Sequence, residues 1–221
     1  MRWRGLKQEK NEIKQQPTLY AYMSSLSLQY DTIPMTTVNS NDTFESRQGD
    51  SIAQLFGNHN LIAYDDVADF RESYIRVCKH RLELNEVVII LPYYEMVGSI
   101  EQLLENIGVN VDYYKRAGSL FIVDAVREFF GADYDFAKFL KLLDKGAKKA
   151  GKSGVFVIAN IDGFFLYEGR EKLMQYEREI MKIDLANTRL ICAYYKGNYD
   201  SLTASEKQML KGLHDKIAQR L

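Results

Sequence analysis

Acidic side chains recur where the predicted strands of this chain end. They are Asp65, Asp66, Glu95, Asp124 and Asp162, and each follows or closes an apolar run. In a parallel sheet these strand ends meet at one edge, where open α/β sheets bind their ligands. Clustered carboxylates suit a hard cation such as Mg²⁺, or an amine. Helix caps and turns also favour aspartate at such positions, so a cation site and local capping remain as alternatives.

One carboxylate, Glu177, lies on the apolar face of a predicted helix. At about 100° per residue, Leu173, Ile180 and Met181 fall on the same stripe. A carboxylate in that position must be paired, hydrogen-bonded or protonated. Glu177 therefore either forms a structural ion pair with a neighbouring Arg or Lys, or faces a ligand. We predict that Glu177 is at least partly buried, with a raised pKa or a specific partner.

Residues 146–153, with the sequence GAKKAGKS, match the P-loop expression G-x-x-x-x-G-K-[ST]. A P-loop leaves a strand and opens a helix, so that its amides and the helix dipole face the phosphates. This segment instead leaves a predicted helix and enters the apolar run Val155–Ile161. We therefore interpret it as a solvated helix end that does not bind nucleotide.

The histidines and cysteines show no regular spacing. His59, His80 and His214 share no ligand spacing with one another or with Cys78 and Cys192. Zinc ligands commonly recur at short, regular intervals, so the spacing argues against a metal site. The chain also lacks a Gly-x-Ser-x-Gly elbow and a cysteine in a nucleophile motif. No catalytic residue is therefore assigned.

Apolar runs of strand length alternate with helical stripes from about residue 55 onward. The predicted strands cover residues 60–64, 87–91, 120–124, 155–161 and 190–195. This alternation predicts a doubly wound, mainly parallel α/β sheet of five strands or slightly more, with helices on both faces. The run Gly118–Asp124 is apolar throughout, which we interpret as a central strand, with Val109–Tyr114 as a short edge strand. A Thr203–Glu206 capping box opens a last helix that extends to Ile217.

Composition excludes several classes of protein. The chain has 221 residues, a formal charge of −1 and 46% hydrophobic residues, which fits one large domain with or without an appendage. The balanced charge gives no basic field for nucleic acid, and no apolar run approaches the ~20 residues of a membrane span. Two cysteines without a disulfide framework indicate a reducing interior. We expect a soluble, cytoplasmic protein.

Residues 1–50 differ from the rest of the chain. They are first rich in Lys, Arg, Gln and Glu and then in Ser, Thr and Asn, without a periodic apolar face. Such a segment buries too little apolar surface to offset the entropy of ordering it. We predict a flexible or partner-binding extension over residues 1–50 that is dispensable for folding, and a folded domain over residues 51–221.

Several stretches, taken in order, resemble the MEDS family, a sensory domain named for methanogens, methylotrophs and the DcmR regulator. They are residues 59–66 (HNLIAYDD), 85–90 (NEVVII), 120–124 (LFIVD), 175–177 (QYE), 190–194 (LICAY) and a last helix with His214. The resemblance covers about residues 55–221. It implies a RecA/KaiC-like core that has lost its nucleotide machinery. Tyr64-Asp65-Asp66-Val67 stands where such an ATPase has its P-loop, and Asp124 stands at a Walker-B-like position.

The resemblance implies a non-enzymatic sensory domain that binds a small molecule, such as a hydrocarbon derivative. The ligand would lie at the carboxyl edge of the sheet, near Tyr64, Asp65, Tyr93, Asp124 and Tyr194, with Glu177 behind it. Members are often joined to a DNA-binding or kinase module. None is visible here, so we expect the output to pass through a partner protein, a regulator or a kinase, with a homodimer also compatible. No cofactor, metal, nucleic acid or membrane is expected as a partner.

Two other functions remain as alternatives. A divergent RecA/KaiC-like NTPase would use Asp124 with a Mg²⁺ and a non-standard phosphate loop. It is disfavoured because the chain lacks a strand–loop–helix segment with the glycines and the lysine that a γ-phosphate needs. A ligand-free interaction module would act through residues 1–50.

Overall fold

The computed structural model describes residues 58–125, 135–184 and 186–219, so the predicted extension over residues 1–50 lies outside the described part. Within these residues the chain forms one sheet of six parallel strands in the order β3-β2-β4-β5-β1-β6. The strands are β1 (His59–Tyr64), β2 (Val87–Leu91), β3 (Leu120–Ile122), β4 (Val155–Asn160), β5 (Thr188–Tyr195) and β6 (Lys216–Gln219). The predicted parallel α/β sheet is confirmed.

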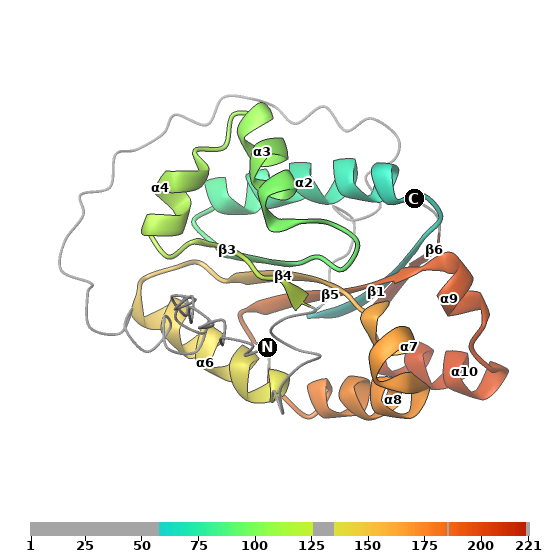
Figure 1. Cartoon of the computed structure of the whole chain (residues 1–221). Helices are drawn as coiled ribbons and strands as arrows, with labels where there is room; N and C mark the ends of the chain where they lie inside the picture. Colours follow the sequence, from blue (N-terminus) through green and yellow to red (C-terminus); the bar gives the residue numbers. More distant parts are fainter. Residues whose placement is uncertain (1–57, 126–134, 185, 220–221) are drawn as a thin grey trace, which may run out of the picture.

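Helices cover both faces of the sheet (Figure 1). On one face lie α2 (Val67–Glu83), α3 (Val97–Asn106) and α4 (Val111–Arg116). On the other lie α6 (Phe136–Lys149), α7 (Gly163–Tyr167), α8 (Gly169–Ile180) and α10 (Ala204–Leu213), with α9 (Lys196–Asp200) following β5. None of the helices in the described ranges has both the length and the apolar composition that crossing a membrane requires.

The central strands carry continuous apolar runs because each face packs against its own layer of helices. Along β1, Leu61 and Ala63 belong to the core shared with α6 and α8, whereas Ile62 and Tyr64 belong to the core shared with α2 and α3. Successive side chains of a strand point to opposite faces. A strand covered on both sides therefore reads as a continuous apolar run.

Local capping signals set several helix starts. Thr203 accepts from the backbone N–H of Glu206, and Glu206 in turn accepts from the Thr203 N–H, which confirms the predicted capping box of α10. Asp135 caps α6 by accepting from the N–H of Lys138. The Ser99–Gln102 pair, which has the same sequence pattern, is not a cap, because α3 already begins at Val97.

Two predictions about strands are wrong. The run Gly118–Asp124 forms only the three-residue β3, which lies at the edge of the sheet and pairs with β2 alone. A uniformly apolar strand indicates that helices cover both faces of the sheet. Helices can cover an edge strand in this way as well as a central one. Residues 109–114 form no strand, because Asn110 accepts from the N–H of Tyr113 and starts α4 there.

The last helix also differs from its prediction. It ends at Leu213, whereas a helix reaching Ile217 was expected. Ile217 instead lies in β6 and pairs with Leu61 of β1. The apolar residue fits a helical stripe and a buried strand equally well, so the pattern alone does not mark the boundary.

Candidate functional site

A cavity of about 620 Å³ opens at the carboxyl ends of β2 and β4. Leu91 ends β2 and Asn160 ends β4, and both line it. The chain leaves these neighbouring strands toward opposite faces, to α3 on one side and to α7 and α8 on the other (Figure 1). Such a topological switch point is where open α/β sheets bind ligands.

The cavity lining combines aromatic and aliphatic side chains with charged ones. Three aromatic rings line one part of it, from Phe136 of α6, Phe164 of α7 and Tyr176 of α8. The centroid of the Tyr176 ring lies 5.4 Å from that of Phe136 and 4.9 Å from that of Phe164. Lys141 and Lys172 line the same cavity with exposed side chains. The volume falls within the ~300–1,000 Å³ of small-molecule sites. The chemistry suits a molecule with an apolar body and one polar end.

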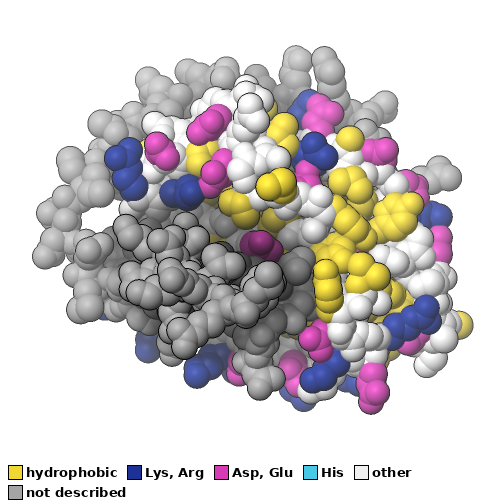
Figure 2. All heavy atoms as spheres, viewed as in Figure 1, with side chains coloured by type: hydrophobic (Ala, Val, Ile, Leu, Met, Phe, Trp, Pro, Cys, Tyr) yellow, Lys and Arg dark blue, Asp and Glu magenta, His cyan; other side chains and the backbone are white. Residues whose placement is uncertain are grey.

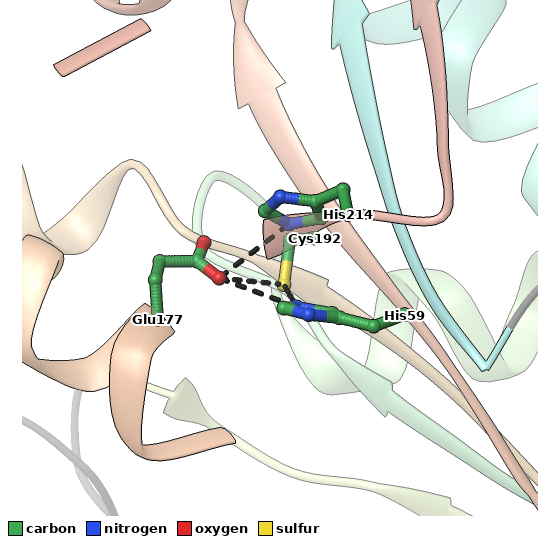
Figure 3. A group of neighbouring side chains, drawn as sticks. All are labelled: His59, Glu177, Cys192 and His214. Carbon is green, nitrogen blue, oxygen red and sulfur yellow. Dashed lines mark hydrogen bonds and ion pairs between the residues drawn. The ribbon is translucent and has the colours of Figure 1, made fainter. Parts of the chain in front are cut away.

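A second group lies on the other side of α8, inside the core. It consists of His59 on β1, Glu177 on α8, Cys192 on β5 and His214 between α10 and β6 (Figure 3), here named the His–Glu–Cys–His cluster. All four residues are buried, and one ligand atom from each lies within 4.8 Å of the others. Tyr194 donates its hydroxyl hydrogen to Oε1 of Glu177. The cluster thus joins segments that are far apart in the sequence.

Hydrogen bonds to the backbone orient both imidazoles of the cluster. His59 Nδ1 donates to the carbonyl of Leu213 at 3.1 Å, and His214 Nδ1 donates to the carbonyl of Leu210 at 2.8 Å. A carbonyl oxygen only accepts, so both Nδ1 atoms carry hydrogen. Both Nε2 atoms therefore face Glu177, whose Oε2 lies 3.2 Å from His59 and 3.4 Å from His214.

Burial and mutual contacts shift the ionisation of the cluster. Burial acts to raise the pKa of Glu177, but His214, His59 and Tyr194 outweigh it and hold the pKa below its usual value. Burial lowers the pKa of His214, and Glu177 opposes this shift only in part. Burial raises the pKa of the Cys192 thiol, and the nearby Glu177 raises it further. The group therefore combines a carboxylate, two imidazoles and a protonated thiol, residue types that could hold a metal ion.

A family model described as MEDS, the methanogen/methylotroph, DcmR sensory domain, matches residues 58–213. The chain belongs to the MEDS family. The resemblance that its residues carry is thus confirmed. The chain is also similar to the crystal structure of a KaiC-like protein from the hyperthermophilic archaeon Pyrococcus horikoshii OT3, with 14% identity, 73% of this chain and 72% of that chain covered, and a TM-score of 0.48. No curated protein matches the chain.

The MEDS domain does not gather its sequence-predicted site residues in one place. Glu177 is buried and paired, as predicted, and Tyr194 is one of its partners. Tyr64 is also buried, but it belongs to the core on the opposite face of the sheet. Asp65 and Asp124 are exposed, and an ion pair of 4.0 Å joins Asp65 to Lys196.

Tyr93, the remaining predicted residue, contacts Tyr94 and Tyr167 edge to face. Tyr94 is 47% and Tyr167 is 55% exposed. We name these three residues the tyrosine patch. Figure 2 shows hydrophobic side chains gathered on this face of the molecule, to the right of the grey atoms, in the region where Figure 1 shows α7. Tyr93 therefore belongs to the tyrosine patch, and it also lines a small pocket of about 20 Å³ together with Phe70 and Tyr74.

Asp162 has a larger structural role than the turn predicted for it. It is fully buried and accepts hydrogen bonds from the Tyr64 hydroxyl at 2.8 Å, the Tyr195 N–H at 2.9 Å and the Asn198 amide at 2.8 Å. Burial raises its pKa, although these donors act to lower it. The carboxylate ties together the carboxyl ends of β1, β4 and β5. Its position directly after an apolar strand was the only signal in the sequence.

The P-loop look-alike of the MEDS domain lies between α6 and β4, as expected. Lys152 donates to the side-chain oxygens of Asn85 at 3.1 Å and Ser119 at 2.7 Å. Burial lowers the pKa of Lys152. Gly151, with a φ of +67°, turns the chain from the helix into the strand. The segment faces the carboxyl end of a helix, whose dipole repels phosphate.

We expect Lys152→Ala to lower the free energy of unfolding by about 1–2 kcal/mol, because two hydrogen bonds from a charged donor are lost. Binding of ATP, measured by titration calorimetry, should be absent before and after the change. Lys149→Ala, at an exposed position in the last turn of α6, is the matched control and should leave the urea melt unchanged. Measurable ATP affinity that disappears in Lys152→Ala alone would contradict this interpretation.

The residues that sequence reasoning missed are His59, Cys192 and His214. The absence of a linear ligand spacing argued against a metal site, yet these side chains lie together because parallel pairing places β1 between β5 and β6. Within the sequence, the only signal was that each falls in or beside an apolar segment.

Proposed function

We propose that this MEDS domain is a non-enzymatic sensor that binds a small organic molecule in the cavity between α6 and α8. The observation that carries the proposal is the cavity itself, which has aromatic and aliphatic side chains in its lining and lies at the topological switch point between β2 and β4. The family to which the chain belongs is described as a sensory domain, which supports the same role.

The lining favours a ligand with an apolar body and a single polar end. Phe136, Phe164 and Ile180 offer apolar surface, and exposed lysines and glutamates also line the cavity. Burying the apolar part of such a ligand supplies the affinity, and the charged side chains orient its polar end. The cavity lies at the carboxyl edge of the sheet, where the sequence analysis expects a ligand, but its lining consists of residues other than those expected there.

The segment after β1 supports a role without nucleotide chemistry. The Tyr64 ring stacks on Phe70 with centroids 4.3 Å apart, and its hydroxyl bonds to Asp162. A phosphate loop at this position needs glycines and a lysine that approach the nucleotide. Here the chain instead continues as Asp65, Asp66 and Val67.

The signal would leave through a partner protein, a regulator or a kinase. Tyr176 lines the cavity from α8, and α7 precedes α8 and carries Tyr167 of the tyrosine patch. Exposed apolar surface of this kind commonly binds other proteins. A ligand that moves α8 would therefore also act on this surface.

The proposal is tested with an apolar anion, 8-anilinonaphthalene-1-sulfonate, as the probe. Ala137 lines the cavity from the first turn of α6, so Ala137→Trp should fill it and weaken probe binding at least about tenfold. Ala204→Trp, at an exposed position at the start of α10, is the matched control and should bind as wild type. Thermal melts of each variant show whether the fold is retained.

Native mass spectrometry of the freshly purified full chain adds a second measurement. A co-purifying organic molecule that Ala137→Trp excludes would support the sensor. A bound nucleotide would favour the divergent NTPase instead. Equal probe binding by wild type and a folded Ala137→Trp would contradict the proposed cavity site and favour a ligand-free interaction module.

A further inference from the structure

We propose that His59, Glu177, Cys192 and His214 form a binding site for one divalent transition-metal ion, of which Zn²⁺ fits best. This site is separate from the cavity and does not depend on the ligand proposed for it. All four side chains converge on one point inside the core (Figure 3).

Three of the six distances between the ligand atoms are close to those of a tetrahedral site, and all six are within 4.8 Å. Zinc bonds of ~2.0–2.3 Å give a tetrahedron with edges of about 3.3–3.6 Å. The measured edges are 3.2 Å from His59 Nε2 to Glu177 Oε2, 3.4 Å from His214 Nε2 to the same oxygen, and 3.4 Å from His59 Nε2 to Cys192 Sγ. Sγ lies 3.9 Å from Glu177 Oε2. Binding a central ion would move the four atoms inward and turn apart the two imidazole rings, whose centroids lie 4.0 Å from each other.

The hydrogen-bond pattern leaves this point with one weak donor, the Cys192 thiol, whose Sγ lies 3.9 Å from Glu177 Oε2. Both Nδ1 atoms give their hydrogens to backbone carbonyls, so a neutral imidazole presents its Nε2 electron pair to Glu177. His214 Nε2 has no hydrogen-bond partner within the described part of the chain, and its side chain has 0% exposure. Buried polar and charged groups of this kind are either paired or coordinate a metal ion. A metal ion meets this requirement for all four groups at once.

The surroundings have the form of an outer shell around a metal site. Metal-binding histidines typically donate their other ring N–H to a carbonyl or a carboxylate, which fixes the ring and its tautomer. Both histidines do so here, through Leu210 and Leu213. Tyr194 donates to the second oxygen of Glu177 and so leaves Oε2 for the ion.

The donor set selects the class of metal. Two imidazoles, one carboxylate and one thiolate are ligands for zinc and related borderline ions, whereas Mg²⁺ and Ca²⁺ prefer oxygen alone. Four protein ligands without an open position are typical of a structural zinc site. The ion would join β1, α8, β5 and the segment before β6. It would therefore hold α8, the helix that borders the cavity.

A protonated imidazole paired with Glu177 is the competing explanation. It would make the cluster a buried ion pair without metal. The two explanations differ in two measurable properties, because a proton gives no metal stoichiometry and no cysteine-to-metal absorption band. The test therefore detects the metal directly.

The full chain is purified and its zinc content is measured by mass spectrometry. It is then refolded with Co²⁺ as a spectroscopic probe. We expect equimolar zinc in wild type, and a thiolate-to-cobalt charge-transfer band after refolding. Cys192→Ala should lose this band and weaken Co²⁺ binding by more than the ~10–100-fold that follows from loss of an outer-shell partner. Cys78→Ala is the matched control, since Cys78 is equally buried but packs on the opposite face of the sheet.

Wild type alone decides the main question, because a variant in the core can fail to fold. Wild type without zinc, and without a cobalt band after refolding with Co²⁺, would overturn the proposal. A cobalt band that persists in a folded Cys192→Ala, or one that disappears in Cys78→Ala, would overturn the assignment of the ligands. His80→Ala removes an exposed histidine and should leave the bound metal unchanged; a loss there would show surface binding only.

Discussion

Glu177→Gln is expected to lower the free energy of unfolding of the zinc-loaded protein by ~3–5 kcal/mol, the cost of removing one partner from a buried charged group. The change keeps the shape of the side chain, which is fully buried, and removes its charge. In the zinc-loaded protein it removes a metal ligand that faces both His59 and His214. Urea denaturation with excess Zn²⁺ measures the loss.

The same change should have little effect on the metal-free protein. The glutamine oxygen can still accept from Tyr194, and its amide can donate to an imidazole Nε2 that otherwise lacks a donor. We therefore expect a loss of no more than about 1 kcal/mol in the presence of a chelator, the scale of one net hydrogen bond. Glu179→Gln, on the same helix but exposed, should change neither melt.

The comparison between the two conditions separates the two explanations of the cluster. A large loss of stability that is equal with zinc and with chelator would show a buried ion pair and contradict the metal site. No loss in either condition would show that Glu177 does not contribute to stability at all, against its burial and its contacts.

Asp162→Ala is expected to lower the free energy of unfolding by about 3–5 kcal/mol, because several buried donors lose their acceptor at ~1–3 kcal/mol each. These donors are the Tyr64 hydroxyl, the Tyr195 N–H and the Asn198 amide. The loss would loosen the carboxyl ends of three neighbouring strands. Urea denaturation followed by circular dichroism measures it, with the exposed Asp65→Ala as the matched control.

A double-mutant cycle tests the cause of that loss. If an unsatisfied hydroxyl contributes, Tyr64→Phe should cost less in the Asp162→Ala background than in wild type, by about 1 kcal/mol. Additive effects of the two changes would show that the Tyr64 hydroxyl and Asp162 do not depend on each other. A change of less than about 0.5 kcal/mol in Asp162→Ala, the range of ordinary surface substitutions, would contradict the role assigned to the whole network.

The sequence by itself determined the class of fold and the burial of Glu177. Residues 87–91 and 155–159 are apolar because helices cover both faces of the sheet, and this pattern can be read within each run. The position of Glu177 beside Leu173 and Ile180 follows from the helical period, which is also local. The Thr203–Glu206 cap is readable for the same reason, because its two partners are three residues apart.

Only the tertiary structure decided the strand order and the side chains that meet. An edge strand in a doubly covered sheet is as apolar as a central one, so the place of β3 could not be predicted from its composition. His59 and Cys192 are separated by 133 residues and meet because β1 and β5 pair in parallel, with Leu61 opposite Cys192. Pairings between distant strands leave no spacing in the sequence. The His–Glu–Cys–His cluster therefore cannot be recognised from the sequence alone.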